Sequence, residues 1–151
     1  MTKISKPAFI ILSCTWGILY TVAGALVALV LLITGHKPSR WGWAVYFEVG
    51  KHPWGGMEWG PFFIKDRYSG EHLKNHEFGH AIQNCFFGPF MVFLVSLPSS
   101  VRYWTRRLRA RRGHPPKTPY EGVWFEAQAT RLGTGKMKLI QQYEDRREEQ
   151  C

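Results

Sequence analysis

The sequence predicts a mainly α-helical membrane protein that also contains a small β-hairpin. Two observations support this prediction: a long apolar segment without charge stands near the start, and one short central region alternates as a β-strand does. With 151 residues, the chain has room for one domain and little more. We expect an N-terminal transmembrane helix in residues 1–35, a main domain in residues 36–135 and a polar tail in residues 136–151.

The first expected element is the transmembrane helix. Residues 7–35 contain no charged residue, and residues 8–34 (AFIILSCTWGILYTVAGALVALVLLIT) are long enough to cross a hydrocarbon core about 30 Å thick. The alternatives are a soluble core helix, which seldom runs this far without a charge, and a signal peptide that uses Lys3 and Lys6. The apolar region of a signal peptide spans only roughly 7–15 residues and ends at a cleavage motif that is not evident here. We therefore expect a retained span.

The second expected element is the β-hairpin. Residues 43–49 (WAVYFEV) place alternate side chains on opposite faces, residues 50–56 are dense in turn-forming residues, and residues 57–65 (MEWGPFFIK) are extended. Pro61 excludes a central position for the second strand, which is therefore an edge strand or a broken one. Tryptophans could also anchor this region at the lipid headgroups. These tryptophans are Trp41, Trp43, Trp54 and Trp59.

A helix follows the hairpin. Ser69 can cap it near Gly70, and it runs to residue 83 or 87 before Gly88-Pro89 interrupts it. This helix contains the sequence HEFGH at residues 76–80, which is the most informative motif in the chain.

The HEFGH motif predicts a metal site. His76 and His80 stand four residues apart, so both imidazoles share one helix face and can ligate one Zn²⁺. Glu77 is rotated by about 100° from His76, which places it beside the metal as a candidate general base for water. Gly79 would let another backbone approach this helix closely. The alternative is a pair of solvated histidines on an amphipathic helix.

Two histidines require a third protein ligand. Glu126 is the strongest candidate, because apolar residues flank it on a helix expected at 120–132, where a carboxylate is costly unless it is paired or bound to a metal. The alternative for Glu126 is a solvated helix face, and Glu121 is the second candidate. The other candidates lie in a proline-rich loop or in the polar tail, and they are His114, Glu144, Glu148 and Glu149.

Residues 86–104 are the second candidate membrane segment. The segment is short, and Gly88-Pro89 and Pro98 interrupt it. A complete crossing would leave His76 and Glu126 on opposite sides of the bilayer, so we expect a re-entrant or interfacial element, which is tolerated where protein buries the backbone. The alternative is two true spans that hold the metal at membrane depth.

The charge distribution indicates a lipid surface as a partner. The formal net charge is +9, and a basic cluster directly follows the apolar segment. Such a cluster is typical of contact with anionic headgroups on the cytoplasmic side, which places the metal site there and the amino terminus outside. We expect no nucleic-acid binding, because no recognition motif accompanies the charge. The cluster consists of Arg102, Arg106, Arg107, Arg109, Arg111, Arg112 and Lys117.

The cysteines exclude two kinds of site. Cys14, Cys85 and Cys151 are odd in number and widely spaced, which gives neither a disulfide framework nor a Cys-type zinc site.

The two motifs together resemble a known family. HEFGH followed by Glu126-x-x-Ala129 resembles the gluzincin metallopeptidases, including the membrane-embedded CAAX-processing and HtpX-like peptidases. Residues 41–133 are similar to a group of small bacterial membrane proteins. The resemblance implies zinc bound by His76, His80 and Glu126, Glu77 as general base, a peptide or protein substrate, and a bacterial inner-membrane location. Peptidases of this kind bind substrate along a sheet edge, for which the Pro61 segment is the candidate.

One position departs from the family pattern. Where these families commonly have an acid that orients a zinc-binding histidine, this chain has Thr130, which can form a hydrogen bond but supplies no charge. The departure leaves three functions open: a membrane-bound zinc peptidase, an inactive zincin-like scaffold, and a basic lipid-binding protein without metal. Small size and the lack of an obvious substrate cavity favour the scaffold. For the oxyanion, residue type alone offers Tyr120 and His114.

Overall fold

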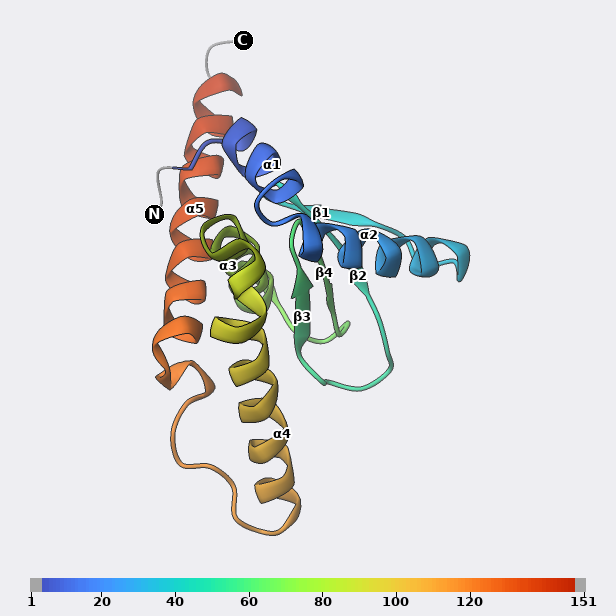
Figure 1. Cartoon of the computed structure of the whole chain (residues 1–151), viewed down its shortest axis with the longest axis vertical. Coiled ribbons are helices and arrows are strands. Elements are labelled where there is room, and N and C mark those ends of the chain that lie inside the picture. The colour runs from blue at the N-terminus through green and yellow to red at the C-terminus, as the bar shows by residue number, and fades with distance from the viewer. Residues whose placement is uncertain (1–3, 149–151) are drawn as a thin grey trace.

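The computed structural model describes residues 4–148, so Glu149 and Cys151 lie outside the described residues. The chain is mainly helical and contains one four-stranded mixed sheet. In Figure 1 the helix α3 (Glu71–Phe87) lies between the long helix α5 (Trp124–Glu148) and the sheet. The predicted mainly α-helical architecture is confirmed.

The predicted single N-terminal helix is wrong. α1 (Lys6–Cys14) and α2 (Ile18–Ile33) are separate helices that meet at an angle of 90°. The chain turns at Gly17, where a Cβ would lie 2.4 Å from the side-chain nitrogen of the fully buried Asn84. Asn84 belongs to α3, so the break between α1 and α2 lies at a tertiary contact that the apolar pattern alone does not reveal.

Among residues 4–148, no helix is by itself both long and apolar enough to cross a membrane. Two bent pairs of helices have the length and the composition to cross a membrane, and only these two properties point to a crossing. The first pair is α1 with α2, and the second is Glu71–Phe90 with Val92–Arg111, which is bent by 116°.

The core lies where α1, the sheet, α3 and α5 meet. Phe9 of α1 is only 1% exposed, and its ring lies 5.7 Å from Trp43 and 6.1 Å from Phe78 of α3. α5 contributes Leu132 and Met137 to the same cluster. Burial of these large side chains is the main favourable term that fixes the four elements together.

The sheet is larger than the predicted hairpin. Its strands are β1 (Ser39–Trp41), β2 (Ala44–Glu48), β3 (Gly56–Trp59) and β4 (Phe62–Lys65), in the spatial order β1-β2-β4-β3. Antiparallel pairs β1-β2 and β3-β4 are joined by a parallel pairing of β2 with β4. The predicted break at Pro61 is present, because this residue lies in the turn between β3 and β4. β3 stands last in the strand order and is an edge strand, as expected for this segment. β4 lies between β2 and β3, so the expectation that Pro61 excludes a central position is wrong for residues 62–65, which follow the proline.

The segment after α3 turns the chain back. Gly88-Pro89 ends α3 as predicted, and a short 3₁₀ turn η1 (Gly88–Phe90) and a π-helical stretch η2 (Val92–Ser96) lead into α4 (Leu97–Arg111). Pro98 does not interrupt the segment again: it lies in the first turn of α4, where proline's missing N–H is best tolerated. Residues 86–104 therefore do not separate the two halves of the predicted metal site.

α5 is longer than the sequence predicts. Instead of a helix that ends near residue 132 and a polar tail, one helix runs from Trp124 to Glu148, preceded by the short turn η3 (Tyr120–Gly122). Met137 is buried, and the ammonium group of Lys136 lies 4.8 Å from the ring centroid of Trp43. The first part of the predicted tail, residues 136–151, thus belongs to the packed structure.

Candidate metal centre

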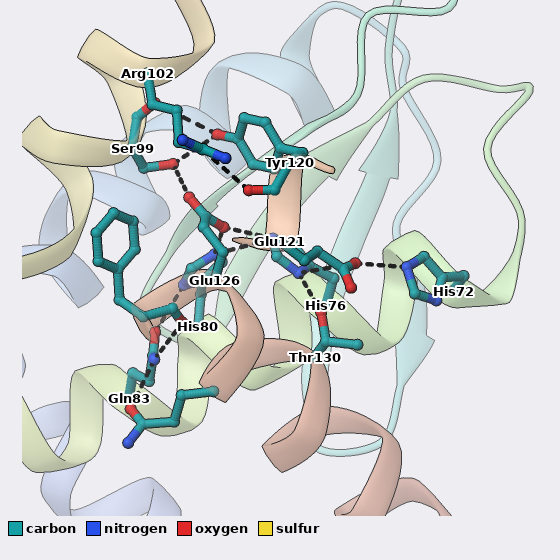
Figure 2. Close-up of polar contacts among 12 residues, drawn as sticks. His72, His76, His80, Gln83, Ser99, Arg102, Tyr120, Glu121, Glu126 and Thr130 are labelled. Atoms are coloured by element: carbon teal, nitrogen blue, oxygen red, sulfur yellow. Dashed lines mark hydrogen bonds and ion pairs between the residues drawn. The ribbon is translucent and has the colours of Figure 1, made fainter. Parts of the chain in front are cut away.

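The three predicted ligands lie together in the structure (Figure 2). Nε2 of His76 lies 3.0 Å from Oε2 of Glu126, Nε2 of His80 lies 3.3 Å from the same oxygen, and the two nitrogens are 3.1 Å apart. All three residues are buried. They form a group that could hold a metal ion.

The spacing of these atoms can be compared with that of a metal site. Ligand atoms at about 2.0–2.1 Å from a tetrahedral ion are separated by about 3.3–3.4 Å from one another. The three observed separations of 3.0, 3.1 and 3.3 Å are close to this distance between the ligand atoms of a tetrahedral site. Three protein ligands would leave the fourth position of a tetrahedron for water or substrate, as in catalytic zinc sites.

Close contact between two helices brings the ligands together. A Cβ at Gly79 of α3 would lie 1.8 Å from the carbonyl oxygen of Ala129, and one at Gly133 of α5 would lie 1.7 Å from that of Asn75. No side chain fits at either position, so the two glycines let the backbones of α3 and α5 touch. The predicted role of Gly79, close approach of another backbone, is confirmed.

Each histidine is oriented through its second ring nitrogen. Nδ1 of His76 lies 2.8 Å from the hydroxyl of Thr130, and Nδ1 of His80 lies 2.8 Å from Oε1 of Gln83. When each Nδ1–H donates to its oxygen, the lone pair of each Nε2 faces Glu126, which is the form that binds metal. Thr130 therefore lies in the predicted position beside a ligand, while Gln83 was not predicted.

The third ligand is held in the same way. Ser99 of α4 donates its hydroxyl to Oε1 of Glu126 at 2.5 Å, and the hydroxyl groups of Ser99 and Tyr120 are 2.8 Å apart. This bond fixes Oε1 on the α4 side and directs Oε2 toward the histidines (Figure 2). One carboxylate oxygen is thus used for orientation and the other is available as a ligand.

The electrostatics of the group favour a positive charge at its centre. Burial alone would raise the pKa of Glu126, but hydrogen bonds with His76, His80 and Ser99 lower it far below its usual range. Burial alone would lower the pKa of His80, but the hydrogen bond with Glu126 and the charge of Glu77 raise it to about 9. The buried carboxylates therefore stabilise a cation placed among these residues, and a bound metal ion would supply that charge.

Glu77 lies beside the ligands and faces the sheet. Its carboxylate is buried, and a Cβ at Gly56 of β3 would lie 2.5 Å from its Oε1. The pKa of Glu77 is raised, mainly because the carboxyl group is buried. The charges of His76 and His80 lower this pKa, and the charge of Glu126 raises it. The predicted base thus stands between the ligand group and the edge strand.

A cavity of about 620 Å³ opens onto the site. The sequence did not make a cavity obvious, and the structure contains one beside the ligand group. Tyr120 lines the cavity, whereas His114 lies in the loop after α4 and lines a separate surface hollow with Arg109 and Arg112. Of the two oxyanion candidates, only Tyr120 is near the metal group. The polar residues of the cavity wall include Glu58, His72, His76, Glu77, His80, Ser99 and Glu121.

The second candidate for the third ligand has a different position. Oε1 of Glu121 lies 2.6 Å from Nε2 of His72 and 3.9 Å from Nδ1 of His76. It approaches the outer nitrogen of His76, beside Thr130, and not the face that Glu126 occupies (Figure 2). Glu121 can thus assist the orientation of His76 but does not complete the ligand group.

Sequence reasoning missed one acidic residue in this region. Glu58 of β3 is 8% exposed and lines the cavity. Burial raises its pKa to about 8, with His80 lowering the pKa and Glu77 raising it. The only signal in the sequence is that Glu58 is an acid among the mostly apolar residues of an extended segment.

Comparisons of this chain with protein-family models, curated protein sequences and solved structures found no match. The resemblance to gluzincin peptidases therefore stays a prediction.

Proposed function

We propose that this protein is a membrane-associated zinc metallopeptidase. The observation that carries the proposal is the triangle of two Nε2 atoms and Oε2 of Glu126, whose edges are close to those of a tetrahedral zinc site. Nitrogen and carboxylate ligands with one open position are the donor set of catalytic zinc in peptidases. The nearby buried Glu77 and the cavity supply the other parts that hydrolysis requires.

The residues around the cavity have distinct roles in the proposed reaction. A zinc ion held by His76, His80 and Glu126 would supply Lewis acidity, which would polarise a carbonyl and lower the pKa of water to about 7. Glu77 accepts the proton of the attacking water and returns it to the leaving amine. Ser99 donates its hydroxyl to Glu126 and therefore accepts the hydroxyl hydrogen of Tyr120. Tyr120 would have to turn this O–H bond away from Ser99 in order to donate to an oxyanion in the cavity.

β3 is the proposed site for the substrate backbone. It is an edge strand, its residues Gly56 to Trp59 line the cavity, and Gly56 lies against Glu77. An extended peptide can add to such an edge through main-chain hydrogen bonds. This position would bring the scissile bond past Glu77.

Two exposed surfaces support an association with lipid. α2 exposes large apolar side chains, including Leu26 (60% exposed) and Ile33 (77% exposed). α4 exposes Trp104 and Leu108 beside the basic cluster. Apolar side chains next to arginines complement an anionic bilayer surface. We infer that the metal site faces the cytoplasmic side of a bacterial inner membrane and that peptide bonds are cleaved near the membrane surface.

Elemental analysis and one substitution test the proposal. The purified protein should contain one zinc per chain, and removal of zinc by a chelator should abolish cleavage of a peptide library monitored by mass spectrometry. Glu77→Gln should keep the zinc and lower hydrolysis by about 10²–10⁴-fold. The matched control is Glu144→Gln on the exposed part of α5. Hydrolysis by a metal-free sample would refute the proposal.

Thr130 favours one other function, an inactive scaffold. A hydroxyl stands where gluzincins commonly have an acid that orients a zinc-binding histidine, so Thr130 orients His76 without supplying a negative charge. For a scaffold, the wild type and Glu77→Gln would bind equal amounts of zinc and neither would cleave any peptide.

A further inference from the structure

Glu58 presents a buried carboxylate that the rest of the site does not use. The residue is 8% exposed, and its Oε1 has no hydrogen-bond partner among the described residues. The backbone of Gly60 bonds the carboxylate. A buried oxygen without a partner is costly in free energy, so its retention in a folded chain calls for an explanation.

The strand geometry places Glu58 on the catalytic side of the sheet edge. Residues two apart on a strand share one face, so Glu58 faces the same side as Gly56, which contacts the carboxylate of Glu77. The separation of such residues along a strand is about 7 Å. Glu58 therefore lies two residues beyond Gly56 on the same proposed peptide-binding edge.

Outside the ligand group, the wall offers this carboxylate no free cation among residues 4–148. It contains no lysine and no arginine from this part of the chain, and its basic groups are three histidines. His76 and His80 belong to the ligand group, and of these His80 acts on Glu58 through its charge. The remaining one, His72, is paired with Glu121 at 2.6 Å. Around Glu58 the wall is largely apolar and aromatic, with Tyr20, Trp59, Met91 and Val95 among its residues. A cation from a ligand would be the partner for Oε1 that the described residues do not provide.

We propose that Glu58 binds a primary ammonium group of the substrate. The inference rests on the proposed peptidase function and specifies its substrate class: a peptide that carries a free amine near the scissile bond. The amine is either the peptide's amino terminus or a lysine side chain. Both form a charge-assisted hydrogen bond with Oε1 of Glu58, and the first would make the enzyme an aminopeptidase.

Binding of hydroxamates to the full-length, zinc-loaded protein tests this proposal without turnover. Three probes are compared by calorimetry: leucine hydroxamate, N-acetyl-leucine hydroxamate, and Nα-acetyl-lysine hydroxamate. The wild type should bind one of the two amine-bearing probes about 10–100-fold more tightly than N-acetyl-leucine hydroxamate, because a hydrogen bond to a charged group contributes about 1.5–3 kcal/mol. The probe that binds more tightly identifies the source of the amine: leucine hydroxamate carries an amino terminus, and Nα-acetyl-lysine hydroxamate carries a lysine side chain.

Substitutions then assign the preference to Glu58. Glu58→Gln should reduce it to within about twofold, while zinc content and the affinity for N-acetyl-leucine hydroxamate stay unchanged. Glu58→Asp keeps the charge and should retain part of the preference. It replaces Glu58→Gln in the test if Glu58→Gln does not fold. The matched control is Glu71→Gln, an exposed residue at the start of α3 that does not line the cavity.

The outcomes separate this proposal from the peptidase function. Equal affinity of the wild type for all three probes, or an unchanged preference in the Glu58 variants, overturns the amine site even where peptides are cleaved. A preference that depends on Glu58 in a protein that binds zinc but cleaves nothing supports the amine site and refutes the peptidase. A protein that binds no zinc refutes both.

Discussion

Nδ1 of His76 and the hydroxyl oxygen of Thr130 lie 2.8 Å apart, across the contact between α3 and α5. The bond selects the tautomer of His76 whose Nε2 faces Glu126. It also joins the two helices directly, so that His76 on α3 is oriented by α5, the helix that carries Glu126.

Substitution of Thr130 should therefore weaken metal binding without removing a ligand. Thr130→Val keeps the shape but loses the acceptor, and we expect the Kd for zinc to rise about 10–100-fold. Thr130→Ser keeps the hydroxyl and should stay close to the wild type. Competition with a chromophoric chelator measures both values. Equal Kd values for Thr130→Val and the wild type would show that the bond has no role in metal binding.

The contact at Gly79 and Gly133 should be sensitive to a single methyl group. Gly79→Ala and Gly133→Ala each place a Cβ within 2 Å of a backbone carbonyl oxygen, so α3 and α5 must separate. Overpacking costs about 1–3 kcal/mol, which corresponds to a decrease in Tm of about 3–10 °C for a chain of this size. Thermal unfolding followed by circular dichroism measures the change.

The control for this pair is Gly70→Ala, because a Cβ at Gly70 meets no atom within 4 Å. Its Tm should stay within about 2 °C of the wild type. The two helix-contact variants should also bind zinc more weakly, since separation of α3 from α5 moves Glu126 away from the histidines. An unchanged Tm and an unchanged zinc affinity in Gly79→Ala and in Gly133→Ala would contradict the close packing of α3 against α5.

The ligand group could be predicted from sequence because its signals are local. His76 and His80 share a helix face through their spacing alone, and Glu126 is conspicuous as an acid among apolar neighbours. Glu58 could not be placed in the same way, since only the pairing of β3 with β4 brings it to the cavity. Burial in three dimensions, and not residue type, distinguishes it from an ordinary strand residue.

The errors in the predicted fold have a common physical cause. The apolar pattern of residues 8–34 is continuous, but Asn84 occupies the space next to Gly17 and the helix breaks there. Conversely, Gly133 ends a helix by local propensity, yet contact with Asn75 keeps α5 continuous through it. In both cases a tertiary contact overrides the local preference, and a single sequence does not contain that contact.

Asp66 should make the stability of the protein depend on acidity. It is fully buried and accepts hydrogen bonds from the backbone N–H groups of Trp54, Gly55, Tyr68 and Ser69. The hydroxyl of Ser69 also donates to it at 2.9 Å, so Ser69 holds this loop and does not cap α3 as predicted. Burial alone would raise the pKa of Asp66, but these hydrogen bonds lower it to about 2.

The sign of the pH dependence follows from this lowered pKa. The unfolded pKa of Asp is about 3.9, so the stabilisation is complete above that pH and is lost as the pH falls toward 2. Asp66→Asn should lower the free energy of unfolding by about 2 kcal/mol at pH 7. The difference from the wild type should shrink between pH 4 and about pH 2. Denaturant unfolding of both proteins across this range measures it, and a difference that grows on acidification would contradict the assignment.

The arginines at the end of α4 should control binding to anionic lipid. Arg102 and Arg106 donate to backbone oxygens of Tyr120 and Thr118, and so hold the loop that follows α4. The later arginines of the basic cluster, Arg109, Arg111 and Arg112, are exposed. Replacement of these three by glutamine should weaken binding to anionic vesicles by about 100-fold, since each basic residue near the surface contributes about 1 kcal/mol.

Two controls distinguish headgroup attraction from insertion of apolar side chains. Binding of the wild type to anionic vesicles should weaken as the salt concentration rises, because ions screen exposed charges beyond a Debye length of about 8 Å at physiological ionic strength. Binding to neutral vesicles depends on apolar residues such as Trp104 and Leu108 and should be the same in the wild type and the triple variant. Equal loss on both kinds of vesicle would mean that the substitutions disturb α4 itself, and unchanged binding to anionic vesicles would show that these arginines do not face the membrane.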